Sequence, residues 1–97
     1  MAVGALIVDI RIATSASLKD KRMIVRHLLD TARRRFAVAA SEIGHHELRQ
    51  RALLGFAAIA SDARHVEEVL DHIDRFIWSH PEVEVLSSSR HWMDLEH

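Results

Sequence analysis

Residues 3–12, VGALIVDIRI, determine the fold class that we expect for this protein. Every even position from 6 to 12 carries a large aliphatic side chain, whereas Asp9 and Arg11 stand at odd positions. This alternation with a period of two predicts a strand that buries one of its faces. The other face is still apolar where the strand begins, so we expect another surface to cover part of it.

Beyond Leu18 the period of the apolar residues lengthens. They now recur at three- and four-residue intervals, which predicts an amphipathic helix of about eighteen residues. The apolar stripe consists of Leu18, Val25, Leu28, Leu29, Ala32 and Phe36. Ser17 can cap the first turn, and Asp20 completes a short-armed capping box.

The remaining sequence adds three strands and one helix. Residues 52–60, ALLGFAAIA, also allow a helix, because alanine and leucine are good helix formers, but Gly55 and Ile59 favour a strand. The second helix is expected between the cap at Asp62 and His80, since the residue before a proline leaves the helical region. The expected strands of this part cover residues 37–43, 52–60 and 82–86. The order β-α-β-β-α-β predicts a ferredoxin-like α+β fold, an antiparallel four-stranded sheet with both helices on one face.

Length and composition limit the class of the protein. The 97 residues are 48% hydrophobic and 28% charged and include no cysteine, which favours one globular domain in a reducing, cytoplasmic location. We expect this domain to span residues 1–94, because Leu95-Glu96-His97 resembles the beginning of a purification tag. Asp9 and Arg11 argue against a secretory signal, and no apolar run approaches the ~20 residues of a membrane span.

Positive charge is concentrated at the beginning of the first helix. Residues 1–35 carry eight Lys or Arg against three Asp or Glu, whereas residues 36–97 carry five against eleven. Cations at a helix amino terminus oppose the helix dipole, which favours an anion there. We therefore predict an anion-binding site in which backbone N–H groups and side-chain charges act together. Its expected residues are Ser17, Lys19, Lys21, Arg22, Arg26 and Arg51.

Two other interpretations of these cations remain open. They can be solvated, with Asp20 offsetting part of their cost, or they can pair with the second helix. The first helix has a basic flank, and the second has an acidic flank at the corresponding position. The members of these flanks are Lys19, Arg22, Arg26 and Arg33, and Glu67, Asp71 and Asp74. If the flanks face each other, they form ion pairs that each contribute little; if they point away, the basic flank is free for phosphate.

No arrangement of residues points to catalysis or to a cofactor. The sequence lacks a glycine-rich phosphate loop and a serine in a glycine elbow, so we expect no enzyme activity, cofactor or metal. A metal at the adjacent His45 and His46 is an alternative, although metal sites prefer separated ligands. Residues 55–59, GFAAI, are similar to a strand of the RNA-recognition motif, but only Phe56 is aromatic there. We therefore expect Phe56 in the core and no standard base-stacking platform.

Four stretches of the sequence together carry a family resemblance. They are SLKDKR at 17–22, HHELRQRALLG at 45–55, HVEEVLDHIDRFI at 65–77 and HPEVEVL at 80–86. From about Val3 to Trp92 the chain resembles the YlxP-like family of small bacterial proteins of unknown function. The resemblance implies a ferredoxin-like fold. Because the gene lies among translation factors and a ribosome-binding factor in some bacteria, it also implies an RNA- or ribosome-associated role.

The resemblance carries over to particular positions of this chain. The family's motif residues correspond to residues 17–22 and to Gln50 and Arg51. Where the family typically has an Asp-Leu-Trp-like step before the Gln-Arg pair, this chain has Glu47-Leu48-Arg49.

Two functions follow as hypotheses. The first is a binding module whose basic helix start, assisted by Arg26 and Arg51, grips the phosphates of RNA or of a ribosomal subunit. The second is a homodimer, without a nucleic-acid role, that associates through its apolar sheet face. The expected interface residues are Val3, Ala5, Ile7, Leu53 and Ile59.

Overall fold

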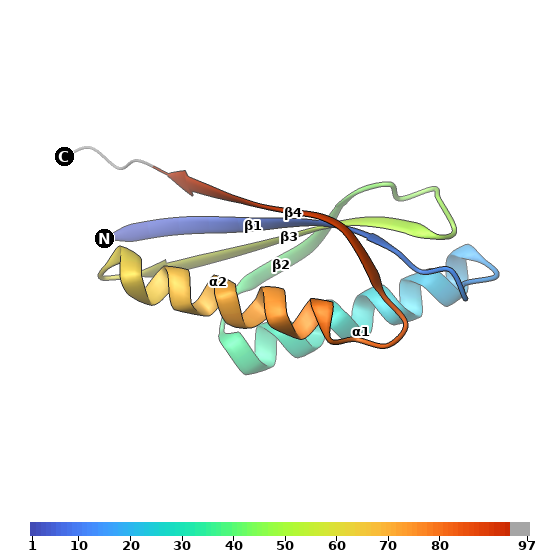
Figure 1. Cartoon of the computed structure of the whole chain (residues 1–97), viewed down its shortest axis with the longest axis horizontal. Helices are drawn as coiled ribbons and strands as arrows, with labels where there is room; N and C mark the ends of the chain where they lie inside the picture. Colours follow the sequence, from blue (N-terminus) through green and yellow to red (C-terminus); the bar gives the residue numbers. More distant parts are fainter. Residues whose placement is uncertain (94–97) are drawn as a thin grey trace.

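A computed structural model of the chain describes residues 1–93, and six regular elements make up most of this range (Figure 1). They are β1 (Ala2–Arg11), α1 (Leu18–Phe36), β2 (Ala39–Gly44), β3 (Arg51–Ala60), α2 (Ala63–Trp78) and β4 (Glu84–Met93). The tripeptide at 95–97 that resembles a tag lies outside the described residues.

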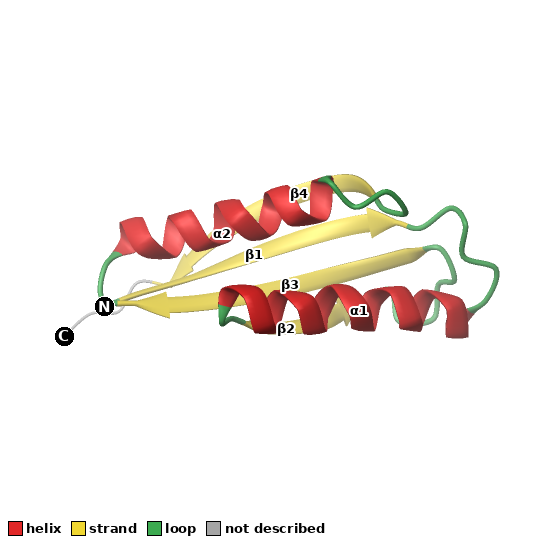
Figure 2. Ribbon diagram, turned by 90° about the horizontal axis from the view of Figure 1, so that it is seen from below, coloured by secondary structure: helices red, strands yellow, loops and turns green. Residues whose placement is uncertain are grey.

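The four strands form one antiparallel sheet in the order β2-β3-β1-β4. Both helices lie on the same face of this sheet and run in opposite directions (Figure 2). α1 packs over β2, and α2 packs over β1 and its two neighbours. This arrangement confirms the predicted ferredoxin-like fold, and within residues 1–93 no layer covers the second face of the sheet (Figure 1).

The core lies between the helices and the sheet and follows the predicted periodicities. The even positions of β1 are buried, and so are the middle residues of the α1 stripe, whereas Leu18 and Phe36 at its two ends are only partly buried. Phe56 is 1% exposed, which confirms it as a core residue. Gly4 allows α2 to approach β1 closely, because a Cβ atom there would lie 2.9 Å from the side chain of Val66.

The boundaries of β2 and β4 differ from those expected by more than one residue. β4 was expected at 82–86 but extends to Met93, because backbone pairing with β1 continues past the polar run Ser87–Ser89. β4 is an edge strand, where polar side chains stay in water, so apolar alternation does not mark its length. β2 starts two residues later than expected, because Ala37 adopts a left-handed conformation (φ 53°) that ends α1.

Candidate functional site

The first turn of α1 is capped as the sequence predicts. The Ser17 hydroxyl accepts a hydrogen bond from the Asp20 N–H (3.1 Å), and the Asp20 carboxylate accepts one from the Ala16 N–H (3.2 Å). Ser17 therefore satisfies a backbone donor of the first turn, whereas Asp20 reaches back to the N–H of the residue before Ser17 and not to that of Ser17 itself. Ser17 thus serves the helix start, and Asp20 places a negative charge among the cations of the first turn.

Lys21 points into the protein rather than toward solvent. Its side chain is fully buried, and Nζ donates to the carbonyl oxygens of His45 (2.9 Å), His46 (3.2 Å) and Arg51 (3.2 Å). The Glu42 carboxylate pairs with the same ammonium at 2.9 Å. An ammonium has three protons to donate, so these partners saturate it. The expectation that Lys21 holds an external anion is therefore wrong.

The contacts of Lys21 fix the loop between β2 and β3. His45 in this loop has a φ of 60°, a left-handed conformation that is strained for a residue with a side chain. This conformation belongs to a loop whose carbonyl oxygens converge on the ammonium of Lys21. Lys21 thus acts as an internal tie between α1 and the hairpin.

Arg51 is also neutralised within the chain. Its guanidinium makes two hydrogen bonds to the Asp9 carboxylate, Nε to Oδ1 at 3.2 Å and Nη2 to Oδ2 at 2.7 Å. The imidazole of His45 lies 3.6 Å from the same carboxylate. This bidentate pair compensates the charge of Arg51 within the chain, and the expected contact of Arg51 with an anion stays a prediction. A sequence signal existed, because Asp9 and Arg51 stand diagonally on one face of two adjacent antiparallel strands.

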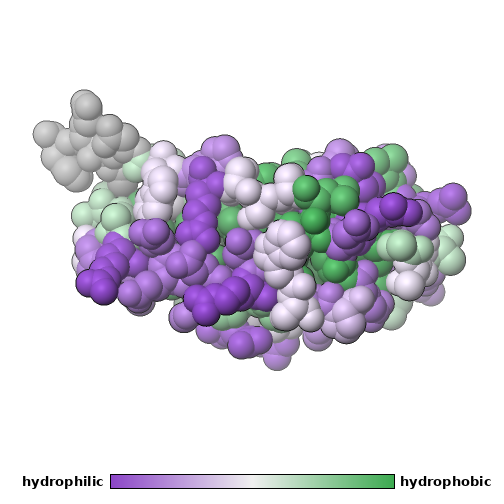
Figure 3. Space-filling view, in the orientation of Figure 1, coloured by the Kyte–Doolittle hydropathy of each residue, from purple (hydrophilic) through white to green (hydrophobic). Residues whose placement is uncertain are grey.

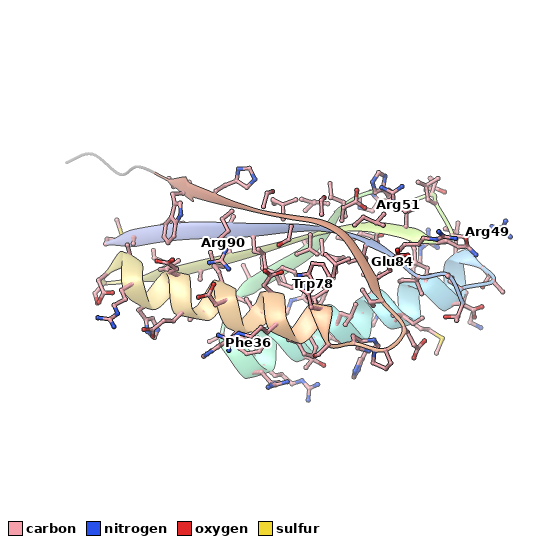
Figure 4. The ribbon with its side chains drawn as sticks, viewed as in Figure 1. Phe36, Arg49, Arg51, Trp78, Glu84 and Arg90 are labelled. Carbon is pink, nitrogen blue, oxygen red and sulfur yellow. The ribbon has the colours of Figure 1, made fainter. Side chains whose placement is uncertain are left out.

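Gln50 connects the β2–β3 hairpin to the loop between β1 and α1. Its side-chain amide donates to the carbonyl oxygens of Ala13 (3.1 Å) and Ser15 (3.3 Å), in the connection between β1 and α1. The motif residues Lys21, Gln50 and Arg51 therefore hold two loops and two strands together. Arg49, one residue earlier, reaches the outer limit of this end of the molecule (Figure 4).

The other predicted cations remain on the surface. Lys19, Arg22 and Arg26 are exposed, and within residues 1–93 their side chains make no hydrogen bond or ion pair with the chain. Next to the two arginines lies a groove of about 300 Å³ between α1 and β2. Its lining residues are Arg22, Val25, Arg26, Leu29, Arg33 and Glu42. We call this the basic groove.

Arg33 and Glu42 in the basic groove are each held by the chain. Arg33 donates to the Asp30 carboxylate at 2.8 Å and to the Ala40 carbonyl oxygen. Glu42 is paired with the buried ammonium of Lys21. The charge of Glu42 is thereby compensated from within, so the groove keeps the positive character of Arg22 and Arg26.

The basic flank of α1 and the acidic flank of α2 point to opposite edges of the sheet. On α2, Asp71 pairs with Arg90 of β4, and Asp74 accepts a hydrogen bond from the Ser88 hydroxyl at 3.0 Å. The basic flank faces β2 instead. The alternative of interhelical ion pairs between these flanks is therefore wrong. Figure 3 shows hydrophilic side chains over α2, with apolar surface toward the beginning of β4.

The five expected interface residues share the sheet face that the helices leave open. The pairing of β1 with β3 sets Val3 opposite Ile59 and Ile7 opposite Gly55, all on this face. Ile59 is 66% exposed, and the side chain of Ile43 packs over Gly55. Two hollows of about 290 and 440 Å³ on this face are lined largely by apolar residues of the four strands. This open sheet face meets the geometric condition for an apolar contact surface.

Within residues 1–93 no group of three or more His, Asp or Glu side chains is arranged to hold a metal ion. Neither of the two helices there combines the length and the apolarity needed to cross a lipid bilayer.

Comparison with known proteins identifies relatives of this chain. A family model described as "Protein of unknown function (DUF503)" matches residues 3–90. The chain is also 35% identical over 78 residues to a Bacillus subtilis (strain 168) protein named "Uncharacterized protein YlxP". This match covers 80% of the chain and 85% of that protein. The motif residues that hold the end of the sheet lie inside the matched region.

Proposed function

Since the chain belongs to the DUF503 family of proteins of unknown function, we propose a function from its own surface: a non-catalytic module of the bacterial cytoplasm that binds RNA phosphate in the basic groove. The observation that carries this proposal is the pair Arg22 and Arg26, exposed beside the groove and unengaged by the rest of residues 1–93. Their flank points away from the acidic flank of α2.

The spacing of the two arginines suits a phosphate backbone. Arg22 and Arg26 stand one turn apart on α1, so their Cα atoms are separated by about 6 Å along the helix axis. A guanidinium presents two parallel N–H donors to a phosphate, and its charge persists at all physiological pH values. Lys19 extends the same flank by nearly one turn toward the helix start, where it adds a third charge.

The expected partner is short single-stranded RNA or a ribosomal subunit. The net formal charge of the whole chain is −1, so no global field attracts nucleic acid and the affinity rests on a few local contacts. Few contacts give a modest affinity that falls as salt rises. The RNA- or ribosome-associated role that the family resemblance implies favours RNA over other anions.

The proposal is tested by changing the two free arginines. Binding of purified ribosomal subunits and of short single-stranded RNA is measured at several salt concentrations for the wild type and for the double variant Arg22→Gln, Arg26→Gln. The variant loses two phosphate contacts, so the negative slope of log K against log salt should become shallower by about 1.4. Arg64→Gln is the control. The Arg64 side chain is 90% exposed in the first turn of α2, away from the basic groove, so its loss should leave binding unchanged. Wild-type affinity in the double variant would reject the proposal.

A second candidate function is homodimerisation through the open sheet face. It is favoured by the apolar hollows on that face and by the exposure of Ile59. Burying these groups against a second copy removes apolar area from water, which stabilises the dimer by about 25 cal/mol for each Å² buried. Light scattering at tens of micromolar should then give a dimer for the wild type and a monomer for Ile59→Lys. A wild-type monomer at this concentration counts against the dimer and leaves the RNA proposal intact, since the two use different faces.

A further inference from the structure

A second groove, on the α2 side of α1, combines aromatic rings with arginines. It has a volume of about 460 Å³ and lies where the last turn of α1 passes the second half of α2. Its lining residues are Arg35, Phe36, His72, Arg75, Phe76 and Ser79. We call it the aromatic groove. Figure 4 shows Phe36 at this place in the helix layer, far from Arg49 and Arg51 at the other end of the molecule.

Three rings lie next to one another along this groove. The centroid of Phe36 lies 6.0 Å from that of Phe76 and 6.4 Å from that of His72. Both phenylalanines are partly buried, so each packs against the core with one part and faces the groove with another. The antiparallel helices bring Phe36 and Phe76 together although they are 40 positions apart in the sequence. No local sequence pattern therefore predicts this cluster.

A planar cation already rests on the two phenylalanine rings. The guanidinium carbon of Arg35 lies 5.1 Å from the ring centroid of Phe36 and 5.5 Å from that of Phe76. The guanidinium therefore covers part of these rings, and a flat ligand group that stacks on them takes its place. Within residues 1–93 neither Arg35 nor Arg75 forms an ion pair with a carboxylate, so both charges are available to a ligand.

We propose that the aromatic groove stacks a base of the RNA strand whose phosphates the basic groove holds, an inference that rests on the proposed function. A nucleotide offers both chemistries that the groove provides, a flat π-face for the phenylalanines and a phosphate for Arg35 and Arg75. Three consecutive arginines, Arg33 to Arg35, connect the two grooves around the end of α1. The ligand is consequently single-stranded, because a base in a duplex is stacked on its neighbours.

The test compares RNA with and without bases. Short single-stranded RNA and abasic oligomers of the same length and charge are titrated into the wild type, Arg35→Gln and Phe36→Leu. The wild type should bind the base-containing RNA on the order of tenfold more tightly, since stacking one base on an aromatic ring supplies a factor of this size. In Phe36→Leu this preference should disappear while abasic binding stays at the wild-type level. Arg35→Gln should weaken binding of both oligomers, because it removes a phosphate partner. Arg64→Gln again serves as the charge-matched control.

The outcomes separate this inference from the proposed function. Equal binding of the two oligomers by the wild type, with loss of both in Arg22→Gln, Arg26→Gln, overturns the stacking site and leaves the basic groove in place. Absence of binding to either oligomer overturns both. Phe36 is partly buried, so thermal unfolding checks that Phe36→Leu is folded. As a second variant, His72→Ala removes an exposed ring from the surface of α2 and should reduce the base preference without affecting the fold.

Discussion

Lys21 and Arg22 are neighbours in the sequence, yet they belong to two different parts of the molecule. Lys21 is fully buried, and its ammonium donates to three carbonyl oxygens and pairs with Glu42. Arg22, in contrast, lies exposed beside the basic groove. The same motif therefore supplies an internal tie and a surface cation. The comparison teaches that a run of basic residues at a helix start does not by itself indicate a ligand.

Helix geometry explains the division between the two residues. Successive residues of α1 differ by about 100° around its axis, so adjacent side chains point in different directions. Lys21 precedes Val25, Leu28 and Ala32 at helical intervals, which places it at the head of the buried column. Its apolar stem suits that column, and its ammonium reaches the loop carbonyls beyond it.

The largest effect is expected from removing the buried cation. Lys21→Met keeps the length of the side chain but leaves Glu42 and three carbonyl oxygens without their partner. Breaking a buried charge pair in this way destabilises by about 3–5 kcal/mol. Urea denaturation should show this loss in the free energy of unfolding. Lys19→Met, an exposed neighbour on the same helix, should change it by less than about 0.5 kcal/mol, and equal stabilities of the two variants would refute the division.

The order of the six elements was predictable because periodicity is local. The alternation in β1 and the helical stripes of α1 and α2 depend on burial of one face, which each segment records in its own sequence. The end of β4 was not predictable in this way, since an edge strand can carry Ser87–Ser89 without loss of backbone pairing.

The candidate site was harder to predict because its decisive contacts are distant. The carbonyl oxygens that bind Lys21 belong to residues 24 to 30 positions later in the chain. Backbone groups carry no residue identity, so nothing in the sequence marks them as partners. The basic flank at Arg22 and Arg26, by contrast, follows from helical spacing alone, and the structure places both residues on one groove. Phe36 was assigned to the core, and only the packing of α1 on α2 shows that part of it lines a groove.

A smaller effect is expected at Gln50, which supports the same end of the sheet with a neutral group. Gln50→Ala removes two hydrogen bonds, to Ala13 and Ser15, that connect the hairpin to the loop before α1. Because the residue is exposed, water replaces part of the loss, and the free energy of unfolding should fall by about 1 kcal/mol. For a domain of this size the midpoint of thermal unfolding then drops by about 4–8 °C. Glu47→Ala in the same loop is the control, and a drop as large in the control would mean that loop composition, not these bonds, is responsible.

The smallest effect on stability is expected from the two exposed arginines, Arg22 and Arg26. Arg22→Gln together with Arg26→Gln should change the free energy of unfolding by less than about 0.5 kcal/mol, since neither side chain has a partner within residues 1–93. Its effect on RNA binding can therefore be attributed to the surface, whereas any set of substitutions that includes Lys21 mixes lost binding with lost structure. Urea denaturation measured beside the RNA titration separates these causes. A destabilisation comparable with that of Lys21→Met would show that the arginines, too, support the fold, and the contrast between the two halves of the motif would fail.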